Sequence, residues 1–114
     1  MKRMLSVLLM AVCATLVSAK QPQLPTSYNF QRGIEAIDNG NQEEGEKYLL
    51  KEIEDNPKNG YAYAWLSSIE YDRDELGNAI TTLQFALKYL PKSDKFYIAW
   101  CYSSLGKIYL ELDD

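Results

Sequence analysis

Residues 61–91 read YAYAWLSSIEYDRDELGNAITTLQFALKYLP, and this stretch decides the fold of the chain. It contains two apolar stripes at helical spacing, separated by the polar segment Asp-Arg-Asp at 72–74, which predicts a turn. Pro91 follows the second stripe and ends it, because proline cannot continue a helix. The stretch therefore predicts a pair of helices. The first stripe is Trp65, Leu66 and Ile69, and the second is Leu76, Ala79, Ile80, Leu83, Ala86, Leu87 and Leu90.

The same pattern recurs on both sides of this stretch. One constant offset aligns an earlier copy with it, and a slightly longer offset aligns a partial later copy. Internal repeats of this kind are typical of stacked helical pairs. The aligned residues are Leu49 with Leu83, Ile53 with Leu87 and Pro57 with Pro91 at the first offset, and Tyr63 with Tyr102, Leu66 with Leu105 and Ser67 with Gly106 at the second.

Helix ends can also be predicted outside the central stretch. Asn39-Gly40 should end a first helix, because glycine accepts the left-handed conformation common at such ends. Asn41 is positioned to cap the next helix, and Glu44 follows three residues later as in a capping box. A last helix is expected from about Lys95 to Leu112, capped by Ser93 or Asp94. No segment alternates like a strand, so we expect an all-α chain of about five helices.

The repeat resembles the tetratricopeptide repeat family. The resemblance covers about Ser27 to Asp114, although Arg32 and Glu52 depart from the family pattern in the first copy. It implies a right-handed α-solenoid of antiparallel helix pairs, and a related helical-pair repeat is the main alternative. The matching residues are Tyr63, Leu66, Ser67, Ala79, Ala86 and Pro91 in the second copy, and Tyr102, Leu105, Gly106 and Tyr109 in the third.

The N-terminal segment has the pattern of a secretory signal. Lys2 and Arg3 precede an apolar run that is too short to span a membrane, and small residues end at Ala19. We therefore expect residues 1–19 to be a signal peptide, cleaved after Ala19, and residues 20–26 to be a flexible leader. The mature chain would be periplasmic or secreted. An uncleaved anchor, or lipid attachment at Cys13, is the alternative and would be its only link to a membrane.

Composition argues against an enzyme. The chain has no His, and only Cys101 remains after cleavage, which excludes His-dependent triads and a Cys/His zinc site. No glycine-rich phosphate loop occurs, and the acidic clusters fit helix starts better than a calcium loop. We predict no metal and no cofactor. The mature chain keeps 10 basic and 16 acidic residues, a net charge of 10 − 16 = −6, which disfavours nucleic acid as a partner.

The family resemblance also implies a binding surface. In tetratricopeptide relatives the first helix of each pair lines a concave groove that holds a peptide. By that resemblance, positions from all three copies are expected to face the groove, although Phe30 and Ile34 could equally pack under the leader. The positions of the family's carboxylate clamp hold apolar or small residues, so an apolar or aromatic peptide is the expected ligand. The expected groove residues are Phe30, Ile34, Ile37, Tyr61, Ala64, Ser68, Tyr71, Ser103, Lys107 and Leu110, with Tyr61 and Tyr71 the better candidates.

The functional expectation is a protein-protein interaction scaffold of the cell envelope. The main alternative is the N-terminal regulatory or sensing part of a longer exported enzyme or signalling protein. The repeat pattern stops at Leu112-Asp113-Asp114, where a third helix pair would need its second helix. We expect either a natural chain that continues beyond this point or another subunit that covers the last helix. A structural protomer that forms homo-oligomers through this helix is a third hypothesis.

Overall fold

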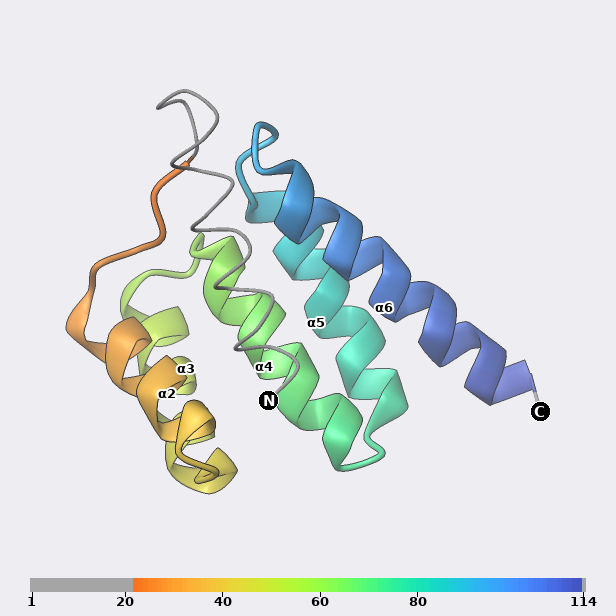
Figure 1. Ribbon diagram of the computed structural model, residues 1–114, viewed down its shortest axis with the longest axis horizontal. Helices are drawn as coiled ribbons and strands as arrows, with labels where there is room; N and C mark the ends of the chain where they lie inside the picture. The colour runs from red at the N-terminus through yellow and green to blue at the C-terminus, as the bar shows by residue number, and fades with distance from the viewer. Residues whose placement is uncertain (1–21, 114) are drawn as a thin grey trace.

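The computed structural model describes residues 22–113, and this part of the chain is all-helical, without strands. Successive helices run in opposite directions, so the chain doubles back at each turn (Figure 1). The predictions of an all-α chain and of about five helices are confirmed. The expected signal peptide, residues 1–19, lies outside the described residues. The helices are α2 (Tyr28–Asp38), α3 (Gln42–Asp55), α4 (Gly60–Asp72), α5 (Leu76–Tyr89) and α6 (Lys95–Asp113).

The predicted turn residues stand at the ends of the first two helices. Gly40 lies between α2 and α3 with φ +86°, a left-handed conformation that glycine adopts without strain. The Asn41 side chain caps α3 by accepting a hydrogen bond from the Glu44 backbone N–H at 3.1 Å. The Asn41 side-chain amide also donates to the Glu44 carboxylate at 3.3 Å. In a capping box the Glu carboxylate would instead accept from the backbone N–H of Asn41. Residues Gly40 and Asn41 therefore determine the turn of this first hairpin, α2–α3.

A left-handed turn residue and a side-chain cap also occur in the second hairpin, α4–α5, and at the start of α6. Asp74 takes a positive φ of 62° in the turn between α4 and α5. Asp94, and not Ser93, caps α6, since its Oδ1 accepts from the Tyr97 backbone N–H at 3.1 Å. The last helix begins at Lys95 as predicted and continues to Asp113, one residue beyond the expected end.

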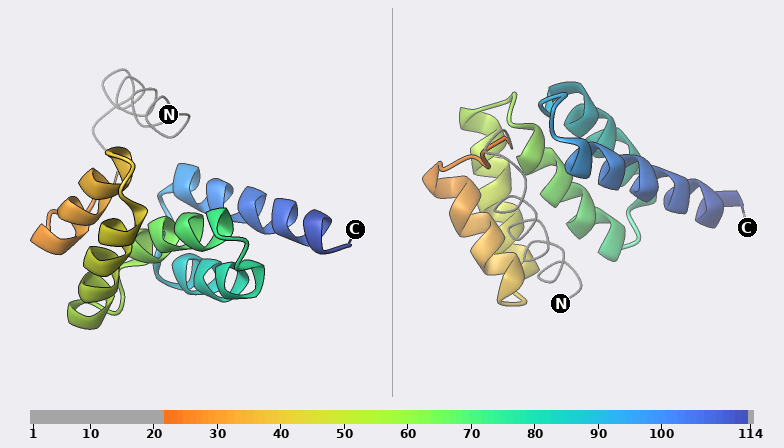
Figure 2. Two further views of the ribbon diagram at one scale, coloured as in Figure 1. Left: turned by 90° about the horizontal axis from the view of Figure 1, so that it is seen from below. Right: turned by 45° about the horizontal axis from the view of Figure 1, so that its top comes forward.

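The core runs through both hairpins and into α6. Trp65, Ala79, Leu83 and Ala86 are all buried, as the repeat pattern predicted. Each hairpin packs within itself, α3 packs against α4, and α5 packs against α6 (Figures 1 and 2). In consequence α4 occupies the middle of the molecule, while α6 lies at one side.

Small residues set the closest helix contacts. A Cβ placed on Gly45 of α3 would lie 2.6 Å from Ile37 Cγ1 of α2. A Cβ on Gly60 would lie 2.5 Å from the Leu90 backbone nitrogen. Such distances are shorter than van der Waals contact, so glycine is needed where these backbones approach.

Glu52 is buried in the core although it is charged. Its carboxylate accepts hydrogen bonds from Ser27 Oγ at 2.8 Å, Asn56 Nδ2 at 3.1 Å and Asn59 Nδ2 at 2.8 Å. These partners come from the start of α2 and from the α3–α4 turn, so Glu52 links the beginning of the first hairpin to the turn that leads into the second. Leu24, within the expected flexible leader, is partly buried against the core.

Candidate functional site

A hollow of about 270 Å³ lies between α4 and α6, and we call it the α4–α6 hollow. Its deepest residues, Leu83 and Ile108, are buried and apolar. Aromatic, hydroxyl and charged side chains form the rim. The lining residues are Ser67, Ser68, Tyr71, Asp72, Leu83, Trp100, Ser104, Lys107 and Ile108.

Three residues that the family resemblance assigned to a groove line this hollow: Ser68, Tyr71 and Lys107. Ser68 and Tyr71 stand one turn apart on α4, and Lys107 faces them from α6. The Lys107 ammonium lies 5.4 Å from the centre of the Tyr71 ring, within range of a cation–π interaction. The structure therefore brings together positions that the whole of α5 separates in the sequence.

The Tyr71 hydroxyl connects the two walls of the hollow. It donates a hydrogen bond to the Glu111 carboxylate on α6. This bond favours the protonated phenol, so it raises the pKa of Tyr71 above its ordinary value. The cation of Lys107 and the anion of Glu111 thus both hold the Tyr71 ring at the rim of the hollow.

The serine hydroxyls of the hollow are anchored to their own helix. Ser67 Oγ donates to the Ala64 carbonyl at 2.7 Å, and Ser68 Oγ donates to the Trp65 carbonyl at 2.9 Å. The hydroxyl protons at the α4 wall are therefore used within the chain. The floor of the hollow, Leu83 and Ile108, is apolar and can take an apolar group of a ligand.

Trp100 and Ser104 line the hollow and were not predicted. Both lie on the same face of α6 as Lys107, two turns and one turn before it. The repeat carried a signal for Trp100, because the offset that aligns Tyr63 with Tyr102 also aligns Tyr61 with Trp100. Ser103, which was expected instead of Ser104, is exposed outside the lining, as is Leu110.

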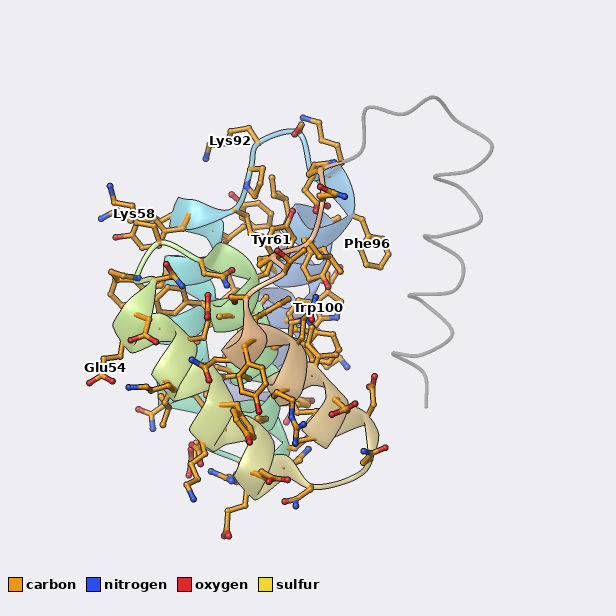
Figure 3. The ribbon with its side chains drawn as sticks, turned by 90° about the vertical axis from the view of Figure 1, so that its left-hand side faces the viewer. Glu54, Lys58, Tyr61, Lys92, Phe96 and Trp100 are labelled. Atoms are coloured by element: carbon orange, nitrogen blue, oxygen red, sulfur yellow. The ribbon has the colours of Figure 1, made fainter. Side chains whose placement is uncertain are left out.

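Tyr61 and Ala64 are buried, so the expectation that they face an open groove is not met in this structure. Tyr61 is 4% exposed and donates to Asp94 Oδ2 at 2.6 Å. Its ring also meets the Tyr97 ring edge-on, with centroids 4.8 Å apart. Burial and this hydrogen bond raise the pKa of Tyr61. The start of α6 thus covers Tyr61, which Figure 3 places inside the molecule, whereas Phe96 projects outward.

Phe30, Ile34 and Ile37 lie away from the α4–α6 hollow. Phe30 and Ile37 are buried, and Ile34 is partly buried. Phe30 and Ile34 border a separate depression with Leu24 and Pro25. This placement fits the alternative in which Phe30 and Ile34 pack under the leader.

A larger depression of about 690 Å³ lies at the end of the molecule where the helices turn. It includes the α3–α4 turn, from which Lys58 projects, and Lys92 projects from the α5–α6 turn at the same end (Figure 3). Its asparagine side chains already bind Glu52, as described above. The depression therefore offers fewer polar groups to a ligand than its size suggests.

Among the described residues we find neither a metal-ligand cluster nor an ionised thiol near neutral pH. Within residues 22–113, no cluster of three or more Asp, Glu or Cys side chains is arranged to hold a metal ion. Burial raises the pKa of the Cys101 thiol to about 12, which keeps it protonated and unreactive near neutral pH. None of the five described helices has the length and apolarity to cross a membrane.

Comparison with known proteins gives no relative. No protein-family model, no curated protein and no solved structure matches the chain.

Proposed function

We propose that the chain is an exported protein-interaction scaffold that binds a peptide segment of its partner in the α4–α6 hollow. The convergence on one hollow of Ser68, Tyr71 and Lys107, three residues that the family resemblance assigns to a groove, is the observation that carries this proposal. The order of the helices, two hairpins followed by α6, is compatible with helix pairs stacked in sequence. The right-handed tetratricopeptide-like solenoid, with α4 and α6 facing the partner, is part of the proposal.

The size of the hollow favours a peptide over a small molecule. Pockets for drug-sized ligands occupy roughly 300–1,000 Å³ and enclose most of the ligand. The α4–α6 hollow measures about 270 Å³, which suits one or two side chains of a longer partner. The remainder of the partner would lie along the helices.

The chemistry of the lining favours an aromatic or aliphatic side chain. Leu83 and Ile108 offer an apolar floor, and Trp100 and Tyr71 offer ring faces at the sides. Lys107 is the only basic residue in the lining, so it can also attract an acidic group that follows the inserted side chain. We expect a partner motif with a large apolar residue beside an acidic one.

Selection from a phage-displayed library of short linear peptides tests this proposal. The immobilised chain should enrich peptides that contain Phe, Trp, Tyr or Leu next to Asp or Glu. Trp100→Ala and Tyr71→Ala should each weaken the selected peptides by about tenfold, as expected for aromatic anchors of an interface.

Tyr28→Ala is the matched control, because Tyr28 is 65% exposed on α2, outside the hollow. It should change affinity by less than about twofold, in line with the small effects of residues outside a binding site. Circular dichroism should show equal helicity for all three variants. Equal binding by the Trp100, Tyr71 and Tyr28 variants would place the ligand elsewhere, and a library without enrichment would contradict the scaffold.

Export is tested separately by the mass of the mature chain. When the gene is expressed in a bacterial host, the periplasmic or secreted product should begin at Lys20. A product that keeps Met4 to Val17 would contradict cleavage after Ala19.

A further inference from the structure

The outer face of α6 carries an apolar stripe that the other described helices cover only in part, since Ile98 and Leu105 pack against the core at its edge. Its residues follow one another at intervals of four, three, four and three, the spacing of a helix that packs along another helix. Tyr102 is 62% exposed, Tyr109 52% and Leu112 55%. The stripe consists of Ile98, Tyr102, Leu105, Tyr109 and Leu112.

Small residues lie beside the large ones on this face. Ala99 and Gly106 are exposed, and a Cβ placed on Gly106 would have no neighbour within 4 Å. Glycine inside a helix makes the helix less stable than alanine would. No contact within the described chain explains that loss, whereas a second backbone approaching Gly106 would use the open space.

Opposite charges stand at the two ends of the same face. Lys95 is the first residue of α6 and Asp113 the last, and this separation corresponds to about five helical turns. Lys95 and Asp113 therefore lie on the same face of the helix as the exposed Gly106. Neither takes part in an ion pair within residues 22–113.

We propose that α6 binds the α6 helix of a second copy of this chain, antiparallel, about a two-fold axis that crosses the helix at the level of Ser104. This axis places Tyr102 of each copy opposite Gly106 of the other, and Tyr109 opposite Ala99. Each of the two exposed tyrosines thus meets a small residue. It also places Lys95 of each copy beside Asp113 of the other, so two ion pairs close the ends.

The pattern of charge and size selects a second copy over an unrelated helix. The face is complementary to itself only when the second helix is reversed, because a parallel pair would place Lys95 beside Lys95. Antiparallel helices also align their dipoles favourably. A face supplied by one helix is small compared with the ~1,200 Å² of a stable interface, so the dimer is weak, with a dissociation constant on the order of 10–100 µM.

Charge reversal tests the proposal by sedimentation velocity of the full chain at low ionic strength over a range of concentrations. Lys95→Asp and Asp113→Lys should each raise the dissociation constant by about tenfold, because attraction becomes repulsion at both ends. An equimolar mixture of the two variants should form a heterodimer with the affinity of the original chain, because both charge pairs are then restored.

Neither charge reversal disturbs the helix. An acidic residue suits the first turn of a helix and a basic residue suits the last, so both variants should fold with undiminished helicity. Association through any other surface, including the apolar residues 4–17, would not respond to these charges.

Gly106→Gln supplies an independent test. The side chain enters open space in the single chain but blocks the approach of a second helix, so the dissociation constant should rise by about tenfold. Gly77→Gln is the matched control, since Gly77 on α5 is equally exposed and open. A chain that stays monomeric at millimolar concentration would overturn the proposal. So would unchanged association of the charge variants, or a mixture that shows no preference for the heterodimer.

Discussion

Helices α4 and α6 have similarly apolar sequences but opposite surroundings. Apolar residues make up 8 of the 13 residues of α4 and 12 of the 19 of α6. Yet eight residues of α4 are buried and only three of α6. The difference shows that position in the stack, and not composition, decides how much of a helix is covered. Covered faces stabilise the fold, and the faces of α6 that remain open are available to partners.

The largest effect should come from the tryptophan of α4. Trp65 is 7% exposed and donates from Nε1 to the Tyr97 hydroxyl at 3.3 Å, whereas Trp100 on α6 is only partly buried. Trp65→Ala should lower the free energy of unfolding by about 3–5 kcal/mol, because it leaves a cavity in the core. Urea unfolding measures this loss. Trp100→Ala is the control with the same side chain, and an equal loss in both variants would remove the distinction between the two helices.

One substitution should act in opposite directions in the two helices. At Gly60 of α4 a Cβ would lie 2.5 Å from the Leu90 nitrogen, so Gly60→Ala should destabilise the fold by about 1–3 kcal/mol through overpacking. At Gly106 of α6 the Cβ meets nothing within 4 Å, so Gly106→Ala should stabilise it by roughly 0.5–1 kcal/mol. Thermal unfolding at low protein concentration measures both. A stabilising Gly60→Ala change would contradict the close packing of α4, and a destabilising Gly106→Ala change would contradict the open surroundings of α6.

The inner side of α6 should make the fold sensitive to alkali. Burial raises the pKa of Cys101 from 9.0 to about 12, so the folded state favours the protonated thiol. This contribution is complete below pH 9 and is lost as the pH rises toward 12, because the unfolded thiol ionises first. Between pH 8 and 10 the original chain should lose about 1 kcal/mol more than Cys101→Ala.

Urea unfolding at a series of pH values measures that slope. Tyr61 and Tyr97 also have raised pKa values, but unfolded tyrosine ionises near 10, so their effect appears at higher pH. Parallel stability curves for the two proteins up to pH 10 would mean that the thiol is accessible to water in the folded chain.

Much of the fold could be predicted from local pattern. Helical spacing is visible in both apolar stripes, with Trp65 and Ile69 in the first and Ala79 and Ala86 in the second. The polar residues 72–74 between the stripes predict the turn that joins the two helices. Apolar spacing and turn residues are reliable within one helix pair, because residues that are close in the sequence are also close in space there. The caps at Asn41 and Asp94 are local in the same sense.

The candidate site was predicted only in part because it depends on contacts between pairs. Helical spacing gives the face of α4 that carries Tyr61, but not how far the start of α6 covers it. One position along a helix turns the side chain by about 100°, so Ser104 reaches the hollow and Ser103 does not. Glu52 was similarly beyond local pattern, because its partners come from segments as far away as Ser27.

The smallest effect should be found on the outer face of α6. Tyr102 is 62% exposed, so Tyr102→Ser should change the free energy of unfolding by less than about 0.5 kcal/mol when the chain is dilute and monomeric. The adjacent Cys101, fully buried on the opposite side of the same helix, shows how sharply one residue step separates the two faces. Repeating the measurement at millimolar concentration should enlarge the loss for Tyr102→Ser, because dimerisation stabilises the original chain by mass action. A loss of more than about 1 kcal/mol in the dilute chain would mean that this face is covered within the monomer, since exposed positions rarely contribute so much. In that case α6 would resemble α4, and the open face on which the dimer depends would not exist.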